Sequence, residues 1–219
     1  SVSKKLERFE DFHFHQLRHT YTSNLLSNGD MFDAKTKHQM YVDIYDDAMW
    51  LINLVENLLS VSRLEGGQMN LHLSTELIGE VVAEALRHIN RRSAEHHLHI
   101  QSGDEYLLAQ MDAHLIVQVI INLVDNAAKA YDTGMENRKV CLTVSGSTIE
   151  VSDNGRGIPK EALPRIFEPF YMVDKSRSKK SGGSGLGLTL VRKIADAHGA
   201  EITVESSVGK GTTVRLRFQ

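Results

Sequence analysis

Three polar side chains near the middle of the chain have the types and spacing to hold a metal ion and a phosphate group. Asn122 and Asn126 are four residues apart, and Lys129 follows three residues later. In a helix these spacings place all three side chains on one face. Amide oxygens coordinate hard cations such as Mg²⁺, and a lysine ammonium is a point charge for phosphate. The segment predicts either a magnesium–phosphate site or a polar stripe that faces solvent.

A second segment combines a carboxylate with two glycines. Asp153 follows a predicted strand, and Gly155 and Gly157 come directly after it. A carboxylate accepts hydrogen bonds from an amino group such as that of adenine, and the glycines let backbone and base approach closely. Taken alone, the segment is also compatible with a plain turn.

A third segment is a glycine-rich loop that leads into a predicted helix. It reads Gly182-Gly183-Ser184-Gly185-Leu186-Gly187. Such a loop presents backbone N–H groups and the positive end of the helix dipole to phosphates. Its spacing is not that of the P-loop, and it lacks the βαβ context of a dinucleotide site. The loop therefore indicates a phosphate site of another kind.

A fourth segment carries two aromatic residues, Phe167 and Phe170, and continues into a polar stretch over residues 172–182. That stretch contains four basic residues, Arg177 among them, and ends in glycine. We expect it to be a mobile lid whose basic side chains meet nucleotide phosphates. A solvated loop is the alternative.

The elements that position these segments follow from hydrophobic periodicity and turn signals. Residues 68–219 predict a two-layer α+β domain. We expect strands at 70–73, 98–101, 107–111, 140–144, 148–152, 202–205 and 213–218, and helices at 74–92, 112–131 and 187–198. A capping residue begins each of the first two helices, Ser74 and Asp112.

The first 67 residues predict a helical hairpin. Helices are expected at 6–27 and 31–65, with a turn at Asn28-Gly29 and a boundary at Gly66-Gly67. The second helix carries an apolar stripe at heptad spacing that it cannot bury alone, so a second copy is expected to complete a four-helix bundle. A helical stalk without chemistry is the alternative.

Composition limits the function classes. The formal net charge is −3, which argues against nucleic-acid binding driven by bulk charge. The single cysteine, Cys141, fits a reducing compartment. No apolar run approaches the roughly 20 residues of a membrane span. The chain does not begin with Met, so we expect a cytoplasmic protein or the cytosolic piece of a longer, membrane-anchored one.

Together, in this order and spacing, the four segments resemble the N, G1, F and G2 boxes of the Bergerat-type ATP-binding domain of sensor histidine kinases. Gly209-Lys210-Gly211-Thr212 is similar to the last glycine box of that family. The resemblance implies the sandwich fold shared with gyrase and Hsp90, with ATP and Mg²⁺ as cofactors and Asn126 as the metal ligand. The nucleotide-binding residues that it implies are Asn122, Asn126, Lys129, Asp153, Gly155, Gly157, Phe167, Phe170, Arg177, Gly183, Gly185, Leu186, Gly187 and Thr212.

One position separates subfamilies. The hydrolysing relatives carry a general-base Glu four residues before the metal-binding Asn, and here Asn122 stands there. An amide cannot act as a general base at neutral pH. The resemblance therefore implies a kinase that delivers the γ-phosphoryl group to a histidine and then to a response-regulator receiver domain. Residues 45–60 and 104–109 further resemble Kdp-type potassium and osmotic sensor kinases.

The phosphoacceptor segment departs from the family pattern. The family carries H-[E/D]-L-R-T-P, and the match here is His15-Gln16-Leu17-Arg18-His19-Thr20. By this resemblance His15 and Arg18 are the catalytic candidates, with His19 as second choice for the acceptor. Gln16 replaces the acid that takes the proton, and the run from His15 to the turn is short by about two helical turns. A nucleotide-binding pseudo-kinase is therefore an alternative.

Residues 12–27 also resemble the H-x-L-R-H-T box of tyrosine recombinases, in which the His and Arg contact the scissile phosphate. A tyrosine nucleophile in its usual context is not evident. A recombinase fragment is thus a remote alternative, and a junction between two genes near residues 23–29 is a hypothesis.

Overall fold

The computed structural model describes residues 34–65, 71–92, 98–102, 107–131, 137–173 and 184–218. The chain divides into two compact units, Ser1–Met49 and Trp50–Gln219. The predicted first helix, its turn, the recombinase-like segment, His15 and Arg18 lie outside the described residues. The predicted helical hairpin and domain boundary therefore stay predictions.

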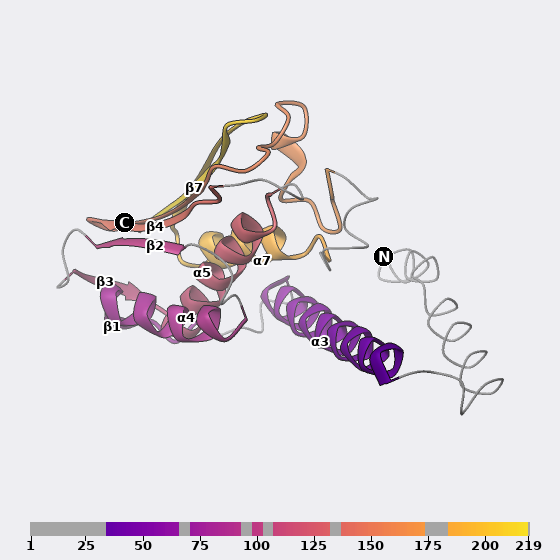
Figure 1. Ribbon diagram of the computed structural model, residues 1–219. Coiled ribbons are helices and arrows are strands. Elements are labelled where there is room, and N and C mark those ends of the chain that lie inside the picture. Colours follow the sequence, from indigo (N-terminus) through magenta and orange to yellow (C-terminus); the bar gives the residue numbers. More distant parts are fainter. Residues whose placement is uncertain are drawn as a thin grey trace. The chain divides into compact units, whose positions relative to one another are not determined.

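Helix α3 spans Ala34–Glu65 and confirms the predicted long helix to within three residues (Figure 1). Its 32 residues reach about 48 Å at 1.5 Å per residue. Many of its apolar side chains face solvent. They are Tyr41, Val42, Ile44, Tyr45, Ile52, Val55, Leu58 and Leu59.

The second unit contains a five-stranded sheet in the order β2-β4-β5-β7-β6 (Figure 1). The β2–β4 pair is parallel and the other neighbours are antiparallel. The strands are β2 (Leu98–Ser102), β4 (Val140–Ser145), β5 (Thr148–Asp153), β6 (Glu201–Ser207) and β7 (Gly211–Arg217).

Among the described residues, the second layer is formed by the helices α4 (Ile78–Arg92), α5 (Ala113–Ala128) and α7 (Gly187–Ala197). A short 3-10 helix, η2, spans Leu163–Arg165. The core lies between the helices and one face of the sheet, with Ile116, Leu142 and Leu216 fully buried. This α+β sandwich confirms the predicted fold class for the second unit.

The start of the second unit corrects two predictions. Residues 71–73, expected to end a strand, have no regular structure, and β1 instead covers Ser74–Leu77, where a helix was expected to begin. β1 pairs antiparallel with β3 (Leu108–Met111), so Ser74 is not a helix cap. Gln110 Nε2 donates to Thr75 Oγ1 at 2.6 Å, and the Ile78 N–H donates to the carbonyl of Leu107. Tertiary pairing overrides the local helical preference of this stretch.

Helix α5 begins as predicted. Asp112 is its N-cap, and its Oδ1 accepts from the Leu115 N–H at 3.3 Å. The Asp112 backbone N–H donates to His198 Nε2 at 3.0 Å, which ties the start of α5 to the end of α7. This anchoring fixes the helix that carries the predicted metal-binding amides.

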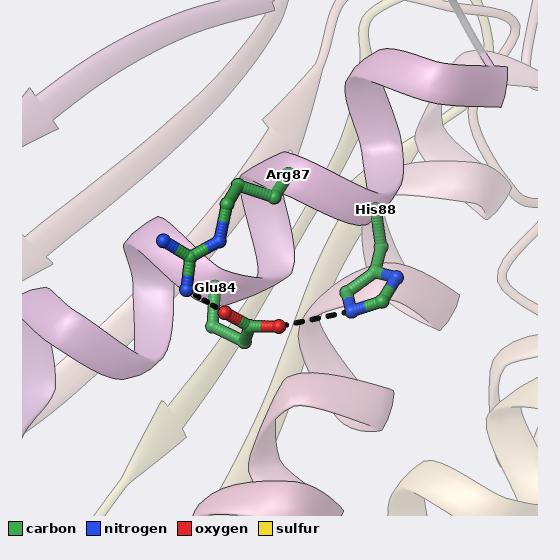
Figure 2. A network of polar contacts seen from close by, with 3 residues as sticks. All are labelled: Glu84, Arg87 and His88. Atoms are coloured by element: carbon green, nitrogen blue, oxygen red, sulfur yellow. Dashed lines mark hydrogen bonds and ion pairs between the residues drawn. The ribbon is translucent and has the colours of Figure 1, made fainter.

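The exposed surface of α4 carries a cluster of local polar pairs around Glu84. Glu84 pairs with both Arg87 and His88, three and four residues later, and the His88 Nε2 lies 3.1 Å from Glu84 Oε1 (Figure 2). All three side chains are exposed, so these contacts contribute little to stability.

Candidate functional site

The two predicted amides meet the beginning of α7. Asn122 is half-buried, and its Nδ2 donates to the Gln118 carbonyl at 2.9 Å, which orients its side chain. Asn126 is exposed. A Cβ atom placed on Gly187 would lie 3.0 Å from Asn122 Oδ1 and 3.8 Å from Asn126 Nδ2. The first residue of α7 thus lies against both amides, which brings the predicted metal and phosphate segments together.

Lys129 lies at the end of the same helix. Its Nζ is 2.6 Å from Asp125 Oδ2, one turn earlier, and both side chains are partly exposed. An exposed pair of this kind is worth about 0–1 kcal/mol. The strong negative charge of a phosphate can therefore compete for the ammonium, and the predicted phosphate contact of Lys129 stays a prediction.

Asp153 is the last residue of β5 and is half-buried. Its Oδ1 accepts from the Gly155 N–H at 2.8 Å. Burial raises the pKa of Asp153 above its ordinary value, while hydrogen bonds from the backbone of Gly155 and Thr212 and the charge of Arg156 oppose that rise. The backbone N–H of Gly155 therefore orients the Asp153 carboxylate. The carboxylate keeps acceptor lone pairs for a further donor, such as an exocyclic amino group.

Two glycines allow the chain to pack closely around Asp153. A Cβ on Gly155 would lie 2.5 Å from the Ala130 carbonyl oxygen at the end of α5. Gly211 has a φ of 97°, and a Cβ there would overlap the Asp153 carbonyl. These positions exclude any side chain, which gives a physical reason for the glycines that the sequence pattern singled out.

The neighbouring residues extend this packing. The Arg156 N–H donates to the Ala130 carbonyl at 2.9 Å, and the Gly209 N–H donates to the Arg156 carbonyl at 2.7 Å. Gly157, with a φ of 69°, lies against Ser207. Residues 153–157 are therefore fixed between the end of α5 and the β6–β7 turn.

Thr212 lies opposite Asp153 in the β5–β7 register, and its Oγ1 is 2.9 Å from Ser206 Oγ. The predicted last glycine box therefore adjoins the predicted base-reading carboxylate. Sequence separation gives no hint of this adjacency, which results from strand pairing.

The aromatic segment adjoins the glycine loop. The Phe170 N–H donates to the Gly185 carbonyl at 3.0 Å, and a Cβ on Gly185 would lie 2.9 Å from Phe170 Cα. Phe170 has a φ of 63° and Gly185 a φ of 70°. The Arg192 guanidinium lies 5.9 Å from the centroid of the Phe167 ring. Leu186 is buried and precedes α7, so its side chain serves the core.

Two predicted nucleotide contacts, Arg177 and Gly183, lie outside the described residues. Among the residues that are described, no three His, Cys, Asp or Glu side chains gather into a metal site. No described helix has the length and apolar content that crossing a bilayer requires.

Sequence reasoning missed one network at the site. The hydroxyl of Tyr131 lies 2.5 Å from the Lys139 carbonyl and 2.9 Å from Asn154 Oδ1. These residues lie on three separate segments, and no fixed spacing relates them. The only signal available was the position of Asn154 directly after Asp153.

Residues 111–219 match the family described as histidine kinase-, DNA gyrase B-, and HSP90-like ATPases. Over 191 residues the chain is 36% identical to the sensor protein KdpD of Clostridium acetobutylicum, a match that covers 87% of this chain and 21% of that protein. It is 34% identical over 179 residues to the sensor histidine kinase YkoH of Bacillus subtilis, covering 80% and 38%. The chain thus spans well under half the length of these two relatives.

Solved structures of histidine kinases also match the chain. The catalytic domain of the histidine kinase ThkA matches with a TM-score of 0.53 and 29% identity, covering 67% of this chain and 95% of that one. The histidine kinase AdeS of Acinetobacter baumannii matches with a TM-score of 0.64 at 23% identity, covering 94% and 98%. The second likeness shows the fold alone. The protein matches confirm the family resemblance predicted from the four segments.

Proposed function

We propose that this chain, which is a sensor histidine kinase module of the two-component type, binds ATP with Mg²⁺ and transfers the γ-phosphoryl group to a histidine. The phosphoryl group then passes to an aspartate of a response-regulator receiver domain. The observation that carries this proposal is the close approach of Gly187 to the two amides: a Cβ atom placed there would lie 3.0 Å from Asn122 Oδ1 and 3.8 Å from Asn126 Nδ2.

Each end of the nucleotide has a matching group. The carboxylate of Asp153 accepts a hydrogen bond from the adenine amino group. The N–H groups at the start of α7 meet the phosphates, where the helix dipole favours negative charge. The Asn126 amide oxygen would hold Mg²⁺, which neutralises phosphate charge when it is bound. Lys129 leaves Asp125 to contact a phosphate, while Arg177 and Gly183 complete the phosphate contacts.

The absence of an acid at position 122 directs the chemistry away from water. The Asn122 side chain donates to Gln118, and an amide does not take up a proton at neutral pH. The γ-phosphoryl group is therefore kept for an imidazole nitrogen, which forms the N–P bond as the bond to the ADP leaving group breaks. His15 is the proposed acceptor, with Arg18 beside it.

A second copy of the chain is the proposed dimer partner. The many exposed apolar side chains of α3 support this, because a helix of that length gains stability by burying them against other helices. The predicted hairpin over residues 1–67 would supply two of the four helices in the bundle. ATP and receiver domains are cytosolic, so we place this module in the cytosol.

The test is incubation of the chain with γ-labelled ATP and Mg²⁺, followed by acid and base treatment. A label that is lost in acid, stays in base, and disappears in His15→Ala but not in His19→Ala is expected. Asn126→Ala should abolish labelling both in the parent chain and in the His19→Ala background. A label that survives acid would contradict the histidine assignment.

The departures at Gln16 and His19 favour one second candidate, a pseudo-kinase that binds nucleotide without transferring phosphate. It predicts ATP binding that Asn126→Ala weakens, with no labelled protein at any time. Two roles would then remain to be measured. One is removal of the phosphoryl group from a phosphorylated receiver domain, and the other is dimerisation.

A further inference from the structure

Tyr131 connects three segments of the chain through its hydroxyl group. The hydroxyl donates to the Lys139 carbonyl at 2.5 Å, and the Lys139 N–H donates to Asn154 Oδ1 at 2.8 Å and to the Tyr131 oxygen at 3.0 Å. Asn154 Nδ2 donates to the carbonyl of Asn137 at 2.9 Å. The Tyr131 hydroxyl, the Lys139 backbone and the Asn154 side-chain amide therefore all take part in this network.

The network continues the β4–β5 ladder by one step. The last register pair of that ladder is Val140 and Asp153. Lys139 and Asn154 come next, and the Asn154 N–H donates to the Lys139 carbonyl at 3.3 Å. Without the phenol, this terminal pair would rest on a single long backbone hydrogen bond and the side chain of Asn154. The Tyr131 hydroxyl thus secures the residue directly after the proposed base-reading carboxylate.

The same phenol stands directly after the end of α5. Its neighbour Ala130 accepts the Arg156 N–H and leaves no room for a side chain at Gly155. Helix α5 also carries Asn126, slightly more than one turn earlier. The junction at Ala130 and Tyr131 therefore sets the distance between the proposed metal ligand and the proposed base contact.

The electrostatics keep the phenol in its donor form. Burial raises the pKa of Tyr131 above its ordinary value, hydrogen bonds with Lys139 and Asn154 lower it, and the nearby charge of Asp153 raises it. The Arg138 guanidinium, 5.7 Å from the ring centroid, acts in the opposite direction to Asp153. The hydroxyl is accordingly neutral at physiological pH and close enough to Asp153 to respond to its charge.

We propose that Tyr131 is a positioning residue for nucleobase selection, which holds Asp153 at the place where its carboxylate reads an exocyclic amino group. This inference rests on the proposed nucleotide site. It concerns selectivity between bases: a displaced carboxylate loses its bond to the amino group, while contacts to the phosphates persist.

The experiment compares ATP with inosine triphosphate, which carries a carbonyl in place of the amino group. Calorimetric titration of the full chain should show a clear ATP preference. In Tyr131→Phe the Kd for ATP should rise about three- to tenfold, the range for one hydrogen bond, with little change for inosine triphosphate. Glu84→Gln, at an exposed position of α4 outside the proposed site, is the control and should leave both constants unchanged.

Asn154→Ala breaks the same network from the other side. It should reproduce the loss of preference, and the double variant should add little, because both residues act through one network. Equal weakening of both nucleotides in these variants, or no change in either, would overturn the inference.

Asp153→Asn separates the inference from the proposed function. If Asp153→Asn removes the ATP preference while Tyr131→Phe keeps it, the inference alone fails. If the unmodified chain shows no preference at all, base reading by Asp153 fails and the inference fails with it.

Discussion

The two ends of the proposed nucleotide site are held by different kinds of contact. At the base end, Asp153 and its neighbours are enclosed by backbone hydrogen bonds and by glycines that leave no space for a Cβ atom. At the phosphate end, Asn126 is exposed and Lys129 pairs at the surface with Asp125. The geometry of the base end is therefore fixed when the protein folds. At the phosphate end, a bound ligand can reorient the exposed side chains.

This difference indicates which residues determine the stability of the fold and which determine ligand affinity. Substitutions of the glycines at the base end should affect folding first, because they disturb packed backbone. Substitutions at the phosphate end should affect binding first, because the side chains involved contribute little to the folded state. The four predictions below test this division.

The largest effect is expected at Gly211. Replacing it with alanine puts a Cβ into the Asp153 carbonyl at a positive φ, so we expect a loss of about 3 kcal/mol or more in the free energy of unfolding. Chemical denaturation measures this. The matched control is Gly146→Ala, where φ is 54° but nothing lies within 4 Å, and where about 1 kcal/mol is expected. Equal losses at both sites would show that backbone packing at the base end is not special.

Asn126→Ala should weaken Mg²⁺–ATP binding by about tenfold or more, because a charge-assisted contact is lost. The free energy of unfolding should change by less than about 0.5 kcal/mol, since the side chain is exposed. Titration calorimetry and thermal melting in parallel give both numbers. A stability loss as large as the binding loss would place Asn126 in the fold rather than in the site.

Asp153→Asn should alter the pH dependence of stability. The pKa of Asp153 is raised in the folded state, so the folded protein binds a proton more readily than the unfolded chain. The resulting stability is fully present below the ordinary aspartate pKa and is lost as pH rises through the raised value. The variant lacks this loss, so it should be at least as stable as the parent at pH 7 while binding ATP more weakly.

Unfolding curves of the two proteins at a series of pH values measure that difference. The stability of Asp153→Asn relative to the parent should increase with pH across the aspartate range and then stay constant. A relative stability that falls with rising pH would mean that the folded state favours the charged carboxylate.

The smallest effect is expected at Asp125. Asp125→Ala removes an exposed partner of Lys129 and should change unfolding free energy by less than about 1 kcal/mol. In the variant, the Lys129 ammonium does not have to leave the Asp125 carboxylate before it binds a phosphate. ATP affinity should therefore rise by about two- to threefold at low salt and less at high salt. Asp196→Ala, which breaks the exposed pair with Arg192 on α7, is the matched control for surface charge. A fall in affinity would indicate that Asp125 itself supports the metal.

Much of the second unit was predictable from the sequence. The cap at Asp112, the helix over α7 and the hairpin of β4 and β5 depend on local signals, and the structure has them within a few residues of the expected bounds. The error at residues 74–77 has a physical cause. Ser-Thr-Glu-Leu suits a helix start locally, and only its pairing with β3, more than 30 residues later, makes it a strand.

The sequence by itself determined the identity and spacing of the groups that could hold a nucleotide. Helical spacing places Asn122 and Asn126 on one face, and the glycines of the loop indicate a backbone that can approach a phosphate closely. Tertiary structure decided which of those groups meet. Three features join segments that lie far apart in the chain: the close approach of Gly187 to both amides, the position of Thr212 beside Asp153, and the network of Tyr131. Such contacts arise from sheet register and helix packing. The free energy of both depends on residues throughout the core, so no short stretch of sequence predicts them.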